Sequence, residues 1–155
     1  ENPYTFSKDI GEQLCEMYYR VYGVETRICR FYNVYGDSQL TEGEYAAVVG
    51  IFLEQYKHNK PLTITGDGEQ RRDFTHVDDI VDGMFLSMSK EFGTYELGSG
   101  VNYSINELAN MFGEDYPKEY IEERVGEARE TLCKKPDLLL VKNNLKDYIK
   151  GEISE

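Results

Sequence analysis

Apolar residues along the chain follow two alternating periods, one typical of amphipathic helices and the other typical of half-buried strands. The first stretch is helical, and its apolar positions are Ile10, Leu14, Met17, Tyr18, Val21 and Tyr22. Gly23 then closes the helix, as glycine commonly does. Glu12, Glu16 and Arg20 share another face at spacings of four, which predicts a solvated side for this helix.

Short strands and helices alternate after that first helix. The pattern predicts a strand at 25–31, a loop at 36–43, a helix at 45–58 ended by Pro61, strands at 62–65 and 74–77, a helix capped by Asp78, and a strand at 95–97. Gly66-Asp67-Gly68 predicts a turn, and Ser104-Ile105-Asn106-Glu107 predicts a capping box opening another helix. Such alternation indicates an α/β fold. Because no strand precedes the first helix, we expect the chain to begin inside this pattern.

Composition limits the classes of function. A length of 155 residues suits one ordinary domain, and 40% hydrophobic with 30% charged residues is typical of a globular chain. The net charge of −12 would repel a polyphosphate backbone, so we expect no nucleic-acid partner. No apolar run reaches the roughly 20 residues of a membrane span, and the start shows no signal-peptide pattern. We therefore expect no membrane partner.

The cysteines and histidines limit the classes of function further. Cys15, Cys29 and Cys133 are odd in number and form no CxxC pair, which indicates reduced thiols in a cytoplasmic protein. We expect Cys15 and Cys29 to fill the core. His58 and His76 are far apart and lack ligand partners, so no metal site is predicted.

Three features resemble functional motifs but have simpler interpretations. Gly98-Ser99-Gly100 follows a strand and lacks the third glycine of a dinucleotide fingerprint, so it predicts a plain strand-to-helix turn. Asp78 and Asp79 are interpreted as helix-start residues rather than a catalytic carboxylate pair. The acidic run at 114–130 is interpreted as a solvated face.

Tyr4 and Lys8 stand four residues apart in YTFSK, which places a phenol and an ammonium on one helix face. A phenol is a poor base at neutral pH, but an ammonium about 6 Å away favours the phenolate by roughly 3 kcal/mol at an effective dielectric near 20. The pair is therefore a candidate general base for a sugar hydroxyl. An unrelated tyrosine and lysine on a helix surface would show the same spacing.

Several longer motifs resemble the extended short-chain dehydrogenases that act on nucleotide sugars. PYTFSKDIGEQL is similar to the Tyr-x-x-x-Lys helix of that family, and RICRFYNVYG to its following strand and loop. The segment at 43–83, with GDG, RDF and V-x-D, is similar to the next part, and YELGSG and RVGE continue the order. The resemblance covers residues 3 to about 131. From Cys133 onward it fades.

The resemblance implies a fold and a division of the chain. The fold would be the carboxy-terminal part of a Rossmann-type, NAD-binding extended short-chain dehydrogenase with its small substrate-binding domain. Residues 1–36 would end the Rossmann-type domain, and residues 37–155 would form mostly the substrate-binding domain with interleaved Rossmann elements. The family's Gly-rich phosphate loop would precede this chain, so the amino-terminal NAD-binding half is expected to be absent.

The resemblance also assigns residues. Tyr4 and Lys8 match the catalytic pair that contacts NAD. Arg72 and Arg124 match phosphate-contacting arginines, Glu127 matches the acidic residue that holds ribose hydroxyls, and Asn33 matches a substrate contact. Taken without the family, Arg72 could instead form a surface ion pair with Asp73 or Asp67, and Arg124 could be a solvated charge.

These assignments imply a UDP-sugar 4-epimerase that uses NAD, acts on a UDP-hexose or its N-acetyl form, and pairs as a homodimer through the first helix. A nucleotide-sugar 4,6-dehydratase of the same family is an alternative, because the residues that decide between them lie upstream. A second alternative is a non-catalytic nucleotide-sugar-binding or assembly module, for which a retained Tyr4 and Lys8 would serve no purpose.

Overall fold

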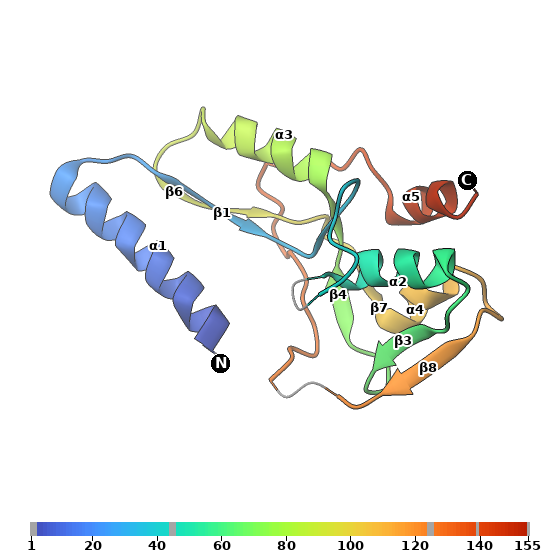
Figure 1. The fold of residues 1–155 in the computed structure, drawn as a ribbon. Coiled ribbons are helices and arrows are strands. Elements are labelled where there is room, and N and C mark those ends of the chain that lie inside the picture. The colour runs from blue at the N-terminus through green and yellow to red at the C-terminus, as the bar shows by residue number, and fades with distance from the viewer. Residues whose placement is uncertain (1–2, 44–45, 124–125, 139, 155) are drawn as a thin grey trace.

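A computed structural model of the chain describes residues 3–43, 46–123, 126–138 and 140–154 (Figure 1). The helices are α1 (Pro3–Tyr22), α2 (Val48–Lys57), α3 (Val77–Ser87), α4 (Ile105–Asn110) and α5 (Leu145–Glu152). The strands are β1 (Arg27–Phe31), β2 (Val34–Tyr35), β3 (Leu62–Thr65), β4 (Arg71–Asp73), β5 (Thr75–His76), β6 (Gly93–Leu97), β7 (Asn102–Ser104) and β8 (Lys118–Ile121). Helices and strands alternate, which confirms the predicted α/β class.

The strands pair two by two. β1 with β6, β2 with β5, and β3 with β8 are parallel, whereas β4 and β7 are antiparallel. Parallel partners need a crossover connection, and helices commonly form part of it. In the chain, α2 lies within the connection from β2 to β5, and α3 lies within the connection from β1 to β6. In Figure 1 the β1–β6 pair lies between α1 on one side and α3 on the other.

The main hydrophobic core lies away from α1. Its buried members come from α2, α4, α5, β2 and β3 with adjoining residues, and the largest include Tyr35, Phe52, Leu62, Ile64, Leu108 and Ile149. The apolar spacing of the second predicted helix accounts for this packing, because Val49 and Phe52 are both buried on its inner face. α2 begins at Val48 with Ala47 as its N-cap, so it starts later than predicted.

One residue of the predicted solvated face of α1 lies against the sheet instead. Glu12, expected on the solvated side, pairs with Arg30 of β1 at 2.6 Å. None of the helix is buried, and Ile10 and Leu14 are exposed. The apolar stripe therefore points to solvent, and Glu16 and Arg20 are exposed as predicted. The side of α1 that meets the rest of the chain carries Glu12 and Tyr19, whose ring stacks on that of Phe92. Even so, no helix in the described ranges is long and apolar enough to cross a membrane.

The start of α3 also differs from the prediction. The helix begins at Val77, and its N-cap is His76, whose ring nitrogen Nδ1 accepts a hydrogen bond from the Asp78 amide at 3.2 Å. Asp78 therefore lies inside the first turn, where a carboxylate complements the helix dipole. The predicted strand at 74–77 is shorter for the same reason, because β5 ends where the cap begins.

Two further predictions need correction. Cys15 and Cys29 are only half-buried, because α1 packs loosely, and the buried thiol is that of Cys133. Gly98-Ser99-Gly100 joins β6 to the short strand β7 rather than entering a helix directly. The capping box is confirmed: Ser104 Oγ accepts from the Glu107 amide at 3.0 Å, and Glu107 Oε2 accepts from the Ser104 amide at 2.7 Å.

The last segment, where the family resemblance fades, completes the core. Leu145 and Ile149 of α5 are buried in it. The chain before α5 is held by the fully buried carboxylate of Asp79, which accepts from the backbone amides of Lys142 and Asn143 and from the Asn143 side chain at 2.8 Å. Asp79 is thus an anchor between α3 and the carboxy-terminal segment, in addition to its place in the first turn.

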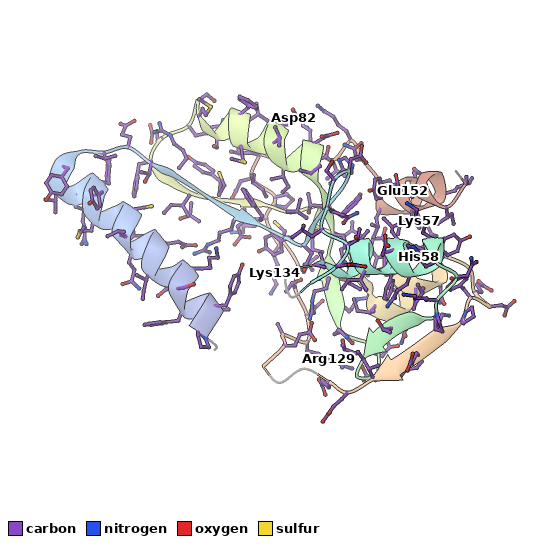
Figure 2. All side chains as sticks on the ribbon, viewed as in Figure 1. Lys57, His58, Asp82, Arg129, Lys134 and Glu152 are labelled. Carbon is purple, nitrogen blue, oxygen red and sulfur yellow. The ribbon has the colours of Figure 1, made fainter. Side chains whose placement is uncertain are left out.

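Asp79→Ala should lower the free energy of unfolding by about 2–4 kcal/mol, because the amides of Lys142 and Asn143 and the Asn143 side chain lose their buried acceptor. Urea denaturation measures this. Asp82, labelled on α3 in Figure 2, provides the matched control: its ion pair with Lys142 is exposed, so Asp82→Ala should cost less than about 1 kcal/mol. Equal losses for the two variants would show that Asp79 does not anchor the segment.

Candidate functional site

A pocket of about 230 Å³ opens beside the amino-terminal end of α2 and strand β3. Three of the predicted binding residues line it, although they are far apart in the sequence: Asn33, Arg72 and Glu127. Its other lining residues include Val48, Thr63, Gln70, Phe74 and Ile121. The pocket therefore combines an apolar wall with a few polar groups, as small-molecule sites commonly do.

Arg72 is buried in the wall of this pocket, where β4 positions it. Its side chain is only 9% exposed. One guanidinium nitrogen donates to the Arg71 carbonyl at 2.8 Å, and the other pairs with Glu127 at 3.0 Å. The alternative partners that the sequence suggested, Asp67 and Asp73, form no ion pair with it.

Glu127 lines the pocket, and the chain just after it is held in place by contacts of Arg129. Arg129, labelled near β3 and β8 in Figure 2, makes two hydrogen bonds to Asp67 at 2.8 and 2.7 Å. The Arg71 amide donates to the Arg129 carbonyl at 2.9 Å, so this segment also runs beside β4. The hydrogen bonds from the Arg129 guanidinium lower the pKa of Asp67 to about 2.

Asn33 lies in the pocket wall with its amide nitrogen already engaged. Nδ2 donates to the Asp73 carbonyl and to Thr131 Oγ1, both at 3.1 Å. A backbone carbonyl can only accept, so the orientation of the amide is determined. The side-chain oxygen is consequently the group that Asn33 can offer to a ligand, and it is an acceptor.

Gln70 has the same arrangement and was missed by the sequence interpretation. It is buried, and its Nε2 donates to both the carbonyl and the hydroxyl oxygen of Thr65, at 2.9 and 3.0 Å. Its side-chain oxygen is the remaining group. A buried glutamine cannot be distinguished from an exposed one by sequence, because no periodicity marks position 70.

The role of Asp73 could not be predicted either, because the donors of its shortest hydrogen bonds lie 26 or more residues further along the chain. Its fully buried carboxylate accepts from Ser99 Oγ at 2.6 Å, from the amides of Ser99 and Gly100 at 2.9 and 3.0 Å, and from the Cys133 amide at 3.0 Å. Thr75 Oγ1 lies at 3.3 Å. Asp73 is therefore a positioning residue that joins three segments behind Arg72 and Asn33.

Tyr4 and Lys8 do not belong to the lining of this pocket. They lie on the first turns of α1, where Tyr4 is 68% exposed and Lys8 Nζ sits 5.1 Å from the centre of the Tyr4 ring. The helix thus brings the two side chains together, as the spacing predicted, in a cation–π contact. Their catalytic assignment stays a prediction.

Burial makes other tyrosines poor bases. It raises the pKa of Tyr32 and of Tyr148 to about 12, and it raises the pKa of Tyr35 further. These three phenols therefore stay neutral over the physiological range and cannot readily take a proton.

One predicted site residue, Arg124, lies outside the described residues, so its assignment also stays a prediction. Over the ranges that the structure does describe, no group of three or more His, Cys, Asp or Glu side chains is placed to hold a metal ion.

Comparison with known proteins relates this chain to a family. The family model described as "NAD dependent epimerase/dehydratase family" matches residues 1–105. A putative UDP-glucose 4-epimerase of Methanocaldococcus jannaschii is 37% identical over 110 residues, covering 71% of this chain and 36% of that protein. UDP-glucuronic acid decarboxylase 1 of Arabidopsis thaliana is 34% identical over 145 residues, covering 92% of this chain and 33% of that protein.

The solved structures that are similar to this chain include UDP-sugar 4-epimerases. The UDP-glucose 4-epimerase of Thermotoga maritima, crystallised with UDP-glucose, has a TM-score of 0.88 and 30% identity, covering 98% of this chain and 52% of that one. The UDP-glucuronic acid 4-epimerase of Bacillus cereus, in complex with UDP-glucuronic acid and NAD, gives 0.85 and 27%, with 99% and 52% covered. The chain therefore spans about a third of the curated relatives' length and about half of these solved chains. It belongs to the NAD-dependent epimerase/dehydratase family.

Proposed function

We propose that this chain is the carboxy-terminal, substrate-binding part of an NAD-dependent UDP-sugar 4-epimerase acting on a UDP-hexose or a UDP-N-acetylhexosamine. The observation that carries the proposal is the convergence of Asn33, Arg72 and Glu127 on one pocket from three distant parts of the sequence. The order of the motifs, from the Tyr4 helix onward, supports placing the chain in the second half of the longer relatives.

Arg72 would bind the pyrophosphate of the substrate. A guanidinium donates in a planar fork that suits phosphate oxygens, and burial strengthens its charge-assisted hydrogen bonds. The acceptor oxygens of Asn33 and Glu127 suit hydroxyl groups instead. Together these groups fit a ligand that has both an anion and hydroxyls, which a nucleotide sugar does. Arg124 would contribute a second phosphate contact.

NAD fits the residues of this chain only at one end. Tyr4 and Lys8 present a phenol and an ammonium on an exposed helix turn, which suits the nicotinamide ribose. In the parts of the chain that the structure describes, no helix follows a glycine-rich turn of the kind that holds a dinucleotide pyrophosphate. The rest of the cofactor site would thus come from the half that precedes this chain.

In the complete enzyme, Tyr4 would take the proton from the C4 hydroxyl of the sugar as general base, and return it after the keto sugar has turned over. Lys8 would stabilise the phenolate by its charge. NAD, when bound, would supply the hydride acceptor for this oxidation and the hydride donor for the reduction that follows.

The exposed stripe of α1 supports a homodimer. Apolar side chains that face solvent along a whole helix favour association, and a two-fold axis would bring two such helices together. The exposed members include Phe6, Ile10, Leu14, Met17 and Val21.

Two other functions share parts of this proposal. A dehydratase or decarboxylase of the family would use the same first oxidation. A non-catalytic module that binds a nucleotide sugar is favoured by one observation, namely that Tyr4 and Lys8 do not line the pocket.

Arg72→Leu should weaken the binding of UDP by roughly 10- to 100-fold, because charge-assisted hydrogen bonds of about 1.5–3 kcal/mol are lost. Calorimetry on the 155-residue chain measures the dissociation constant. Arg20→Leu removes the same charge from the exposed surface of α1 and should leave UDP binding nearly unchanged. Equal UDP affinity before and after Arg72→Leu would remove Arg72 from the binding site.

Tyr4→Phe should reduce turnover by roughly 100-fold or more with little change in substrate affinity, because it removes only the hydroxyl that transfers the proton. The measurement needs a chimaera that joins this chain to the preceding half of the Thermotoga maritima epimerase. Tyr22→Phe, on the same helix, is the matched control and should retain turnover. Near-normal turnover of the Tyr4→Phe chimaera would overturn the mechanism and favour the binding module.

Sedimentation velocity should show a dimer at high micromolar concentration, because the α1 stripe is otherwise left in water. Leu14→Glu places a charge in the stripe and should yield a monomer, whereas Arg20→Glu, on the polar side of α1, should remain dimeric. If the unmodified chain stayed monomeric over this range, the dimer proposal would be wrong.

A further inference from the structure

Arg72 is a buried cation that has an anion beside it before any ligand is present. Glu127 lies 3.0 Å from its guanidinium, and the arginine side chain is 9% exposed against 33% for the glutamate. A buried charge without a counter-charge is strongly destabilising. Glu127 therefore satisfies Arg72, and it is the more accessible and more readily displaced of the two.

Any anion that enters the pocket must compete with Glu127. Arg72 is the only cationic side chain among the described residues of the lining, and one of its nitrogens is already committed to the Arg71 carbonyl. An incoming phosphate would take the position beside the other nitrogen. It would then stand within a few ångströms of the carboxylate, where like charges repel.

Besides the hydroxyls of Thr63 and Thr65, the polar side chains that remain in the pocket lining offer acceptors. Asn33 and Gln70 use their amide nitrogens within the protein, which leaves their oxygens. A carboxylate displaced from Arg72 is an acceptor as well. A ligand that carries hydroxyl donors can satisfy these oxygens, whereas a plain anion cannot.

We propose that Glu127 makes the pocket select ligands with hydroxyl groups beside the anion, and reject anions that lack them. A nucleotide takes over Arg72 and gives the released Glu127 a hydroxyl donor. Inorganic pyrophosphate takes over Arg72 but leaves Glu127 with a repulsive neighbour and no new partner. The inference rests on the proposed function, because it assumes that Arg72 binds the phosphates of the ligand.

The test compares two ligands, inorganic pyrophosphate and UDP, by calorimetry on the 155-residue chain. Glu127→Gln keeps the shape but removes the competing charge. Pyrophosphate should then bind about 10-fold more tightly or better, since removing a like charge at this distance is worth more than 1.4 kcal/mol. The affinity for UDP should increase by a smaller factor, because UDP also loses a charged acceptor for its ribose hydroxyls. The preference for UDP over pyrophosphate should therefore fall.

Glu130→Gln is the matched control. It removes the same charge three residues along the segment, outside the pocket lining, and its side-chain oxygen can still accept from Asn102. It should change both affinities by the same small factor and leave the preference intact. A preference for UDP that is unchanged or increased in Glu127→Gln would overturn the inference.

A second background guards against a variant that folds poorly. Arg72→Met removes the buried cation for which Glu127 and the anion compete, so adding Glu127→Gln to it should increase pyrophosphate affinity by a smaller factor than in the unmodified chain. A gain of the same size without Arg72 would refute the competition. The outcomes also separate the two proposals: UDP binding that is independent of Arg72 rejects the proposed function, whereas Arg72-dependent UDP binding with an unaltered preference rejects this inference alone.

Discussion

The carboxylate of Asp73 is fully buried, and among the described residues no cationic side chain bonds to it; the candidate site depends on how that charge is satisfied. Donors from Ser99, Gly100 and Cys133 surround it. A buried anion is costly unless such hydrogen bonds replace its hydration. Because its donors come from separate segments, the same bonds draw β4, the turn after β6 and the chain near Cys133 into one place.

That arrangement explains why Arg72 and Asn33 can hold fixed positions. Arg72 precedes the anchored residue, and Asn33 donates to its carbonyl. Close packing follows from the same contacts: a side chain at Gly98 would collide with Cys133 and Tyr32. A ligand-binding group is most effective when its neighbours prevent it from relaxing. The geometry of the pocket is thus set by residues that never face it.

Local patterns predicted the longer helices and several strands, but they missed β2, β4, β7, β8 and α5 and did not reveal which elements pair. The periodicity around Phe52 and the capping box at Ser104 depend on neighbours in the sequence, so both appear in the structure as predicted. His76 was not foreseen as a cap, because its ring nitrogen substitutes for the usual side-chain oxygen. Glu12 was assigned to the wrong face because Arg30 lies on a different element, and no local pattern reveals that ion pair. Arg72 and Glu127 were found through motifs, yet the contact between them joins residues that the sequence keeps far apart.

Burial of a single cation also resolves an apparent conflict in this chain. With a net charge of −12, the surface as a whole repels anions, and long-range attraction cannot recruit a phosphate-bearing ligand. A guanidinium in a water-poor pocket acts over a short range, where the local dielectric strengthens its bonds and distant carboxylates are screened. The same burial requires a counter-anion when no ligand is present, and Glu127 provides it at 3.0 Å. An acidic protein can therefore bind an anion at a buried cation, provided that the ligand replaces the internal counter-anion. Recognition then depends on which hydrogen-bond donors the ligand offers to the carboxylate that it displaces.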